Sequence, residues 1–420
     1  MGKLNRQKIV LLFFVMNLFI FNIFSQSKKD KVLRPFGKGI INYTAEDNSW
    51  STKMNIRFQT LFTTGYNVSP NLGLNGHFSN FLIRRARLKF SGHAFSPKLK
   101  YKMELGQSNR DIGGFIYDEF KYAPGIILDA VVFWNFAEGF NLWVGQTKLP
   151  GNRERVISSA NLQLVDRSLL NSRFNIDRDI GVQLHHKWST GDPMSSFVMK
   201  EKLSISQGEG RNIVINNIGG FSYTGRLEFL PFGEFDSKGK DDYVSSSFNR
   251  TKTSKLVFAL GGDFNNGASR TFASRGKFME NDSDRGYYTT DITTIFIDLM
   301  YKLKGWSVMA EFANRKAQDP IAKNLDGTAT GMVVMEGKSF NVMAGYLFDS
   351  NWEITGRYTT VDYTNAYTLN KGVTDEVQYT IGVSKYISGH NLKVQADFSY
   401  KETHAKDDGV LARIQIELQL

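Results

Sequence analysis

Residues 145–184 read GQTKLPGNRERVISSANLQLVDRSLLNSRFNIDRDIGVQL. The two ends of this stretch alternate apolar and polar residues as β-strands do, whereas its middle is a long polar segment. Its positive side chains are Lys148, Arg153, Arg155, Arg167, Arg173 and Arg178. A connection of this length in an all-β chain is usually functional or disordered, and its mixture of Leu, Val and Arg argues against disorder. The stretch therefore predicts a basic loop folded into the lumen of a barrel, with a solvated surface loop as the alternative.

The same period of two runs through the chain on both sides of this loop. In residues 54–66, 81–93 and 97–108, one set of alternating positions is mainly apolar and the other is polar. The polar sets include Asn55, Arg57 and Gln59, then Arg85, Arg87 and Lys89, then Lys100, Lys102 and Glu104. Because successive side chains of a strand point to opposite faces, each strand is expected to turn one face to apolar surroundings and the other to water.

Continued along the chain, this pattern predicts sixteen antiparallel strands. Their expected ranges are 52–66, 81–94, 97–108, 126–137, 140–149, 178–189, 194–207, 217–231, 254–265, 287–304, 305–316, 337–349, 350–363, 374–388, 390–403 and 409–420. An even count fits a single-chain bacterial outer-membrane barrel. The fold class predicted for residues 51–420 is therefore all-β, a sixteen-stranded antiparallel transmembrane β-barrel.

The connections between these strands alternate in length. The long ones are 67–80, 109–125, 150–177, 266–286, 317–336 and 364–373, and the connections between them are short. Short turns on one rim and long loops on the other are typical of a transmembrane barrel. The connection 232–253 is long although its place in the order assigns it to the short-turn rim. Either the strand count slips there, or one turn of that rim is extended.

The last predicted strand supports the same location. In residues 409–420 the apolar positions end on Leu420 and alternate with polar ones. This resembles the insertion signal of bacterial outer-membrane proteins, although an aromatic residue is usual at the position of Leu420. In lipid, a closed barrel is the form of sheet that leaves no strand edge unpaired.

Composition agrees with a barrel and excludes several classes of protein. The chain has 38 Gly, 8 Pro and 13% aromatic residues, with a mean hydropathy of -0.31, which excludes a helical membrane bundle but not a barrel with a polar lumen. There is no cysteine, so disulfides, thiolate zinc sites and a lipid-anchored N-terminal cysteine are excluded. The sequence predicts neither a cofactor nor a metal site, because only carboxylates and six His could bind a metal.

Residues 1–25 have the pattern of a cleavable signal peptide. Lys3, Arg6 and Lys8 precede an apolar run, and Ser25 provides a small residue before a cleavage site. An uncleaved anchor is the alternative. Residues 26–50 are weakly patterned and are expected to form an extension before the barrel. The formal charge of +11 falls to +8 without the signal peptide, and the cations are spread along strands, so export and dispersion both disfavour nucleic acid as a partner.

An ordered set of motifs gives this chain a family resemblance. GQTKLP, SSANLQLVDRSL and RDIGVQL resemble the central signature of the phosphate-selective porins of the O and P type. LIRRARLKFSG, LDAVVFW, SISQGEGRN, YTGRLEFLPFGEF, GWSVMAEFANR, WEITGRY and ISGHNLKVQADF resemble further landmarks of that family in the same order. The resemblance covers residues from about 50 to 420. It implies a homotrimeric porin in the outer membrane of a Gram-negative cell that passes phosphate, polyphosphate-like oxyanions or other small anions by passive diffusion.

The resemblance also implies that arginines and lysines line the lumen and that long loops fold inward. Carried over by position, it indicates Arg85, Arg87, Lys148, Arg167 and Arg226. Alternation adds Arg57, Lys89, Lys100 and Lys102 from the water-facing sets, and the basic loop adds Arg153 and Arg155. These eleven residues are the predicted anion pathway. No catalytic residue is predicted.

Several alternatives stay open. The lumen cations could simply pair with carboxylates on the inward faces, and a general preference for anions competes with true phosphate selectivity. A non-selective porin, a structural or adhesin barrel with a closed lumen, and an outer-membrane hydrolase are other possible functions. A hydrolase needs a nucleophile with an oriented His, and no spacing here provides one. His185 and His186 are adjacent and are expected to face opposite ways, and Trp143, like four other tryptophans, fits an interface girdle better than a stacking platform.

Overall fold

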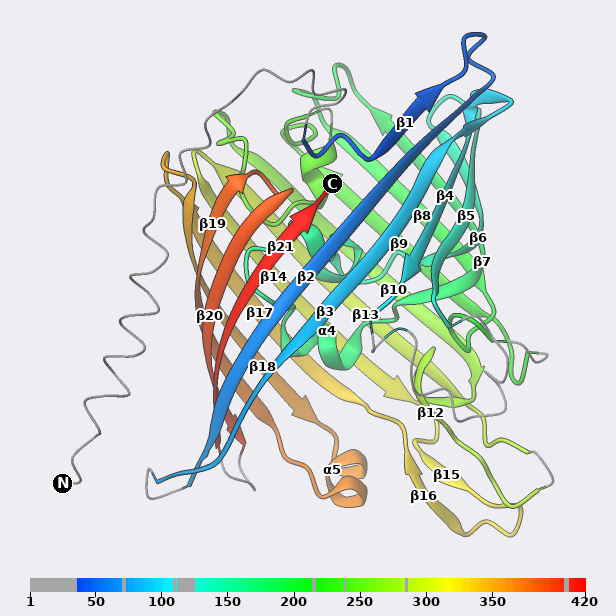
Figure 1. Ribbon diagram of the computed structural model, residues 1–420. Helices are drawn as coiled ribbons and strands as arrows, with labels where there is room; N and C mark the ends of the chain where they lie inside the picture. Colours follow the sequence, from blue (N-terminus) through cyan, green and yellow to red (C-terminus); the bar gives the residue numbers. More distant parts are fainter. Residues whose placement is uncertain are drawn as a thin grey trace. The chain divides into compact units, whose positions relative to one another are not determined.

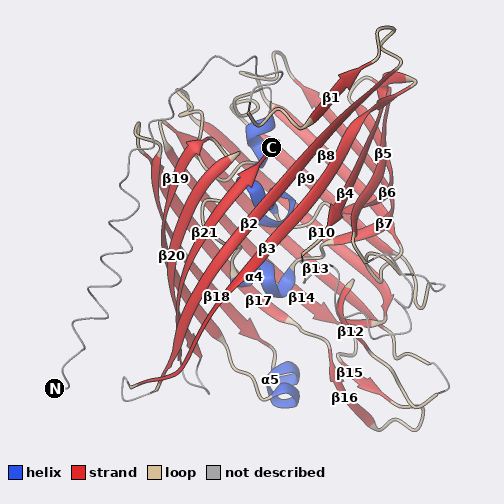
Figure 2. Cartoon of the chain, in the orientation of Figure 1, coloured by secondary structure: helices blue, strands red, loops and turns tan. Residues whose placement is uncertain are grey.

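The computed structural model describes residues 36–69, 73–108, 111, 125–213, 217–237, 239–283, 286–403 and 408–420. The predicted signal peptide and the first part of the predicted extension lie outside the described residues. From Phe36 onward the chain forms one compact unit. Figure 1 traces this unit from β1 to β21, and Figure 2 shows it as strands with a few short helices.

The prediction of sixteen antiparallel strands in a closed barrel is confirmed (Figure 1). The barrel strands are β2 (Trp50–Val68), β3 (Leu74–Ala94), β4 (Ser96–Gly106), β5 (Ile127–Ala137), β6 (Phe140–Lys148), β7 (Arg178–Ser189), β8 (Val198–Ser206), β9 (Ser222–Leu230), β10 (Lys255–Ala268), β13 (Thr290–Leu303), β14 (Trp306–Ala317), β17 (Gly337–Leu347), β18 (Trp352–Tyr363), β19 (Glu376–Ser388), β20 (Leu392–Thr403) and β21 (Asp408–Gln419). Each pairs with the next, and β21 pairs with β2 to close the ring.

The seam between the first and last barrel strands is antiparallel and continuous. Arg57 pairs with Gln419 at one end and Val68 with Asp408 at the other. Where β21 stops, β1 (Ile41–Thr44) takes over the same edge of β2, with Ile41 opposite Met54. The sequence predicted no strand within residues 26–50, because a four-residue strand is too short to show a periodic pattern.

Alternation along the strands separates the lumen from the outer surface. On β2 and β21, Gln59 and Glu417 are fully buried inside the barrel, whereas the neighbouring Phe58 and Ile416 are 46% and 44% exposed. Outward positions elsewhere are also large and apolar, among them Leu203, Ile295 and Ile381. A face of this kind is suited to contact with lipid chains, while the inward face can be polar.

The two rims of the barrel differ as predicted. At the short-turn rim, β13 and β14 are joined by Lys304 and Gly305 alone, both with positive φ angles of 45° and 90°. A two-residue turn with this geometry matches the twist of a hairpin, and glycine adopts it without a steric penalty. The opposite rim carries the hairpins β11 (Arg270–Phe272) with β12 (Arg275–Phe278) and β15 (Ile321–Lys323) with β16 (Ala329–Val333), and helix α5 (Asn365–Lys371) (Figure 1).

Two connections depart from their predicted form. The connection expected at 67–80 is shorter, because β2 and β3 stay paired as far as Val68 and Leu74. The connection 232–253 does belong to the short-turn rim, so the strand count does not slip there. The segment 231–254, of which the structure describes every residue except 238, contains η4 (Lys240–Tyr243) and forms an extended turn that bonds to inward-facing side chains. None of the helices in the described ranges is both long and apolar enough to span a membrane.

Candidate functional site

The connection between β6 and β7 crosses the inside of the barrel and is bonded to the far wall. It contains α3 (Arg153–Val156), η3 (Ser159–Asn161) and α4 (Leu169–Phe174), and α4 contacts β14, β17 and β18 (Figure 2). Its anchors are Arg153 Nε donating to Asp298 Oδ1 (2.7 Å), Arg173 Nε to Glu376 Oε2 (2.9 Å), Gln163 Nε2 to Glu353 Oε1 (2.7 Å), Arg315 Nη2 to the Phe174 carbonyl (2.7 Å) and Lys393 Nζ to the Ala160 carbonyl (2.8 Å). The wall partners come from β13, β14 and β18 to β20.

The apolar residues of this loop explain why it is ordered. Leu149, Leu170, Phe174 and Ile176 form a buried cluster with Phe296, Ala313 and Val361, which are inward residues of β13, β14 and β18. A second cluster joins Ile157, Leu162 and Leu164 to Met309 and Met343. Burying these side chains stabilises the loop against the wall, since each buried aliphatic or aromatic side chain contributes roughly 1.5–3 kcal/mol. The Leu and Val content noted in the sequence therefore serves to hold the loop in place.

Between this loop and the opposite wall lies a cavity of about 1620 Å³. Its lining comes mainly from β3 to β8 and from the loop itself, and extends from Glu138 and Phe140 at the short-turn rim to Arg275 of the β11–β12 hairpin. Among the described residues, eighteen lysines and arginines line it. The lining carboxylates are Glu104, Asp111, Glu138, Asp166 and Asp177. The cavity wall is therefore strongly positive, because these cations outnumber the carboxylates by more than three to one.

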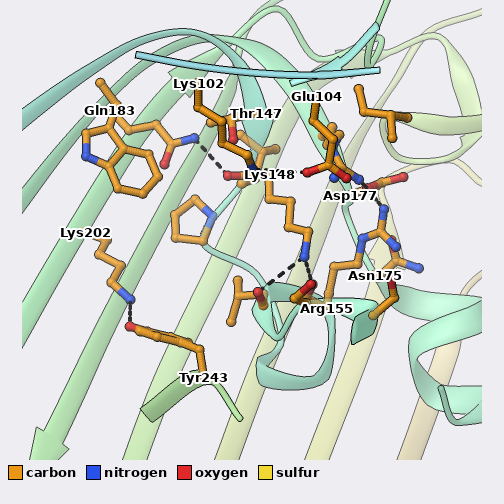
Figure 3. Close-up of a pocket in the computed structure, with 18 of the residues that line it drawn as sticks. Lys102, Glu104, Thr147, Lys148, Arg155, Asn175, Asp177, Gln183, Lys202 and Tyr243 are labelled. Atoms are coloured by element: carbon orange, nitrogen blue, oxygen red, sulfur yellow. Dashed lines mark hydrogen bonds and ion pairs between the residues drawn. The ribbon is translucent and has the colours of Figure 1, made fainter. Parts of the chain in front are cut away.

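A cluster of cations lies where the loop faces this wall (Figure 3). Lys148 Nζ donates to the carbonyls of Arg155 (2.8 Å) and Ile157 (3.2 Å). Arg167 donates to the carbonyls of Glu154 and Ile157, both at 2.7 Å. Within the described part of the chain, no carboxylate lies within ion-pair distance of Lys148 or Arg167. Arg155 forms an ion pair with Asp177. The cluster thus contains more positive than negative charge.

The electrostatics of the loop reflect this crowding. Burial lowers the pKa of Arg167 to about 10, and burial followed by repulsion from Arg167 and Arg178 lowers the pKa of Arg155 well below its usual value. Burial disfavours ionised Asp166, but Arg84 at 2.8 Å and Arg85 and Arg413 at 3.4 Å outweigh it and hold its pKa below the ordinary value. An additional anion would therefore relieve repulsion among these cations.

The structure brings eight of the eleven predicted pathway residues together around the cavity. These are Arg85, Arg87, Lys89, Lys100, Lys102, Lys148, Arg155 and Arg167. The other three, Arg57, Arg153 and Arg226, are not among its lining residues. Arg57 donates to Ser159 Oγ at 2.8 Å and lies 3.8 Å from Glu417.

Arg153 and Arg226 are fully buried in one ion-pair network. Arg226 Nη1 lies 2.7 Å from Asp298 Oδ2 and its Nε lies 2.7 Å from Glu228 Oε1. Arg153 contacts the same two carboxylates, at 2.7 Å to Asp298 and 3.6 Å to Glu228. The alternation of the sequence predicts which side chains point inward, but it does not predict this burial. The path of the loop decides which inward cations face the cavity and which are covered.

Sequence reasoning missed several lining cations. Arg84 lies at an irregularity of β3, where Gln59 pairs with Arg85 but Thr60 pairs with Ile83. Strict alternation would turn Arg84 toward lipid, whereas its guanidinium bonds to Asp166 inside the barrel. Two adjacent arginines beside an alternating run are the only signal that could have indicated a bulge. The other lining cations outside the predicted pathway are Lys98, Arg178, Lys187, Lys200, Lys202, Arg211, Arg275, Arg357 and Arg413.

The extended turn at 231–254 closes part of the same lumen from the short-turn rim. Lys200 pairs with Asp242 and, at 2.8 Å, with Glu234, and Lys302 Nζ donates to the carbonyls of Asp241 (2.9 Å) and Val244 (2.6 Å). Burial raises the pKa of Asp242 against the opposing effect of Lys200. The Ser245 amide donates to the Asn161 carbonyl at 3.1 Å, so this segment and the β6–β7 loop are joined directly.

Two expectations about rings have different outcomes. Trp143 is not a girdle residue: it pairs with Phe133 on the inward face and lines the cavity. Lys148, the last residue of β6, also reaches the cavity although strict alternation from Trp143 would turn it outward, which obscures the pattern of this strand. His185 faces inward beside Gln183, and its neighbour His186 bonds to Glu201 instead, so the two do not converge. No group of three or more potential metal ligands occurs among the described residues.

Comparison with known proteins agrees with this architecture. The family described as phosphate-selective porin O and P matches residues 53–420. An uncharacterised protein of Aquifex aeolicus is 25% identical over 393 residues, which cover 87% of this chain and 86% of that protein. The anion-selective porin from Comamonas acidovorans superposes with a TM-score of 0.54 at 11% identity, covering 88% of this chain and all of that one. Salmonella typhi OmpF in complex with daunomycin also gives 0.54 at 11% identity, over 90% of this chain and all of that one.

Proposed function

The chain belongs to the phosphate-selective porin O and P family, and on this basis we propose that it is a passive channel that prefers anions, with phosphate and related oxyanions among its solutes. As a porin it forms a diffusion channel in the outer membrane of a Gram-negative cell, and its fold is that of outer-membrane porins. In such barrels the short turns face the periplasm and the long loops face outward. The family points to a channel rather than an enzyme.

The observation that carries the proposal is the charge of the cavity wall. In the described part of the chain, eighteen cations and five carboxylates line the cavity that separates strands β3 to β8 from the β6–β7 loop, and we call this passage the lane. The attraction between two opposite unit charges about 4 Å apart is worth ~1 kcal/mol in bulk water and several times more where the dielectric constant is lower. Anions would therefore be concentrated in this lane and cations excluded from it.

The residue types suit stepwise passage of an oxyanion. An anion that enters the lane loses part of its hydration shell and needs replacement hydrogen-bond donors. Arginine offers a planar fork of five donors and lysine a compact charge. Arg84, Arg85 and Arg87 on β3 and Arg155 and Arg167 on the loop provide successive sites of this kind. Several sites of moderate strength allow an ion to move on instead of being trapped.

Pairing of the cations with lumen carboxylates is the competing explanation, and it holds for only part of the lumen. On the covered side, Arg226 and Lys393 are fully buried with Glu228 and Glu417 as partners. On the cavity side, Lys148 and Arg167 bond to carbonyls and have no such partner in the described ranges. The unpaired charge thus lies where a solute would pass.

The size and extent of the cavity favour a channel over a closed structural barrel. A volume of about 1620 Å³ that reaches residues of both rims leaves room for a hydrated small anion. The homotrimer also belongs to the proposal, because a related fold, OmpT of Vibrio cholerae, has been solved in a trimer form.

A competition measurement tests the solute class. Chloride current through purified protein in a planar bilayer is recorded while phosphate is added at constant ionic strength. The proposal expects phosphate to reduce the chloride current at millimolar concentration or below, because it occupies the same lane. Chloride current that is unaffected by phosphate would remove oxyanions from the proposal and leave a general anion porin.

A further inference from the structure

Three rings form a continuous row on the inner wall of the cavity. Phe133 of β5, Trp143 of β6 and His185 of β7 all line it. The centroids of Phe133 and Trp143 are 4.7 Å apart with perpendicular planes, and those of Trp143 and His185 are 3.9 Å apart and stacked at 19°. All three are partly exposed rather than buried. We refer to Phe133, Trp143 and His185 as the ring row.

The ring row has a lysine at each end. Lys100 is the cross-strand partner of Phe133, and Lys202 is the cross-strand partner of His185. Lys202 Nζ lies 4.9 Å from the centre of the Tyr243 ring and donates to the Tyr243 hydroxyl at 2.6 Å (Figure 3). Tyr243 comes from the extended turn at 231–254, so a fourth ring borders the same part of the cavity. Lys100 is exposed and has no ion-pair partner among the described residues.

The ring row does not contribute to the binding of an inorganic oxyanion. Such an anion needs charge and hydrogen-bond donors, which the arginines and lysines of the lane provide, and it gains nothing from an apolar ring face. Exposed rings in a water-filled lumen also forgo the free energy that burial would supply. Flat rings next to ammonium groups suit a solute that carries a ring and a negative charge in one molecule, because the ring can stack while the charge pairs.

We propose that the ring row and its flanking lysines form a subsite for organic phosphate monoesters whose alcohol part is a flat ring. This rests on the proposed function, because the phosphate group would travel the same basic lane. The ring of the ester stacks on Trp143 while its phosphate contacts Lys100, because the ammonium group of Lys202 is already paired with Glu228 at 3.0 Å. The subsite lies near the Ala137–Phe140 turn, so a solute meets it at the periplasmic end of the lane.

The test compares three probes as blockers of chloride current in a planar bilayer: inorganic phosphate, methyl phosphate and phenyl phosphate. The last two differ mainly in the ring. An aromatic pair contributes about 0.5–1.5 kcal/mol beyond area burial, which corresponds to a factor of about two to twelve. Phenyl phosphate is therefore expected to block at a concentration lower than that of methyl phosphate by about this factor. Trp143→Leu should abolish this difference, and Trp143→Phe, which keeps a ring, should retain part of it.

A matched control is available on the same sheet. Trp134 is the neighbour of Phe133 in the sequence but is 50% exposed on the outer face, so Trp134→Leu should leave the ratio of the two blocking concentrations unchanged. Equal blocking by methyl and phenyl phosphate in the native protein would overturn the subsite, as would a ratio that persists in Trp143→Leu. If either of these results is obtained and inorganic phosphate still blocks the chloride current, the proposed function stands without the subsite. If none of the three probes blocks the current, both proposals fail.

Discussion

Replacing Lys148 with Met tests the cation cluster at its centre. The Lys148 ammonium group lies in the lane and is bonded to carbonyls rather than to a carboxylate. The substitution keeps a long side chain but removes the charge, so the chloride-to-potassium permeability ratio should fall while the barrel still folds. The strands on either side of Lys148 do not depend on its charge, since its backbone pairs with Arg178 in the β6–β7 register.

The size of the effect follows from Coulomb's law. An anion that passes about 4 Å from one positive charge gains ~1 kcal/mol in bulk water and ~4 kcal/mol at an effective dielectric constant of 20. The lane is open to water, so the lower figure sets the minimum. Because 1.4 kcal/mol is a factor of ten, removal of this charge should lower the permeability ratio at least about fivefold.

The assay is the reversal potential of single channels under a potassium chloride gradient. Lys148→Arg is the charge-conserving variant and should keep most of the selectivity. Lys385→Met removes one charge outside the cavity lining and controls for the change in net charge. If the reversal potential of Lys148→Met equals that of the native protein and of Lys385→Met, the cluster does not select ions and the reasoning is refuted.

Three further predictions follow from single contacts. Arg84→Gln should reduce anion preference about as much as Arg85→Gln in the same reversal-potential assay, because both side chains contact Asp166; a silent Arg84 variant would contradict its inward position. Asp298→Asn removes one of the two buried carboxylates that Arg153 and Arg226 share and leaves Glu228 to face both guanidinium groups. Breaking a buried ion pair costs roughly 3–5 kcal/mol, so current noise and proteolysis of the 149–177 loop should increase; intact protection would show that other contacts hold the loop. Burial raises the pKa of Glu209 to about 7, so the folded state is favoured while this carboxyl is protonated. The urea concentration at the midpoint of unfolding in micelles should therefore decrease as the pH rises from 5 to 8. This decrease should be smaller in Glu209→Gln.

The barrel itself could be predicted because it repeats one physical rule. Every membrane-spanning strand must turn one face to lipid and the other to water, so a period of two appears sixteen times and the boundaries follow within a few residues. The prediction was wrong where that rule is interrupted. Arg84 lies at an irregularity of β3, and the cavity-lining Trp143 lies in β6, where both Thr147 and Lys148 reach the cavity, so alternation does not predict the inward position of either residue.

The residues that line the cavity could be predicted only in part, because the path of the loop is a tertiary property. Arg87 and Arg226 both face inward and look equivalent in the sequence. The loop packs on β13, β14 and β18 through Leu170 and Phe174, so it covers Arg226 and leaves Arg87 at the cavity. The connection at 231–254 is longer than the other short-turn connections, and the sequence shows this. Its contacts with Lys200 of β8 and Lys302 of β13 do not follow from the sequence, because these strands are far apart along the chain.

The measurement that tests the account most directly is the reversal potential of the native channel under a tenfold potassium chloride gradient at neutral pH. A basic lane between β3 to β8 and the β6–β7 loop predicts a potential close to the chloride equilibrium value. A potential near zero, or one of the sign expected for potassium, would mean that the lining cations are neutralised in the working channel and would contradict the account.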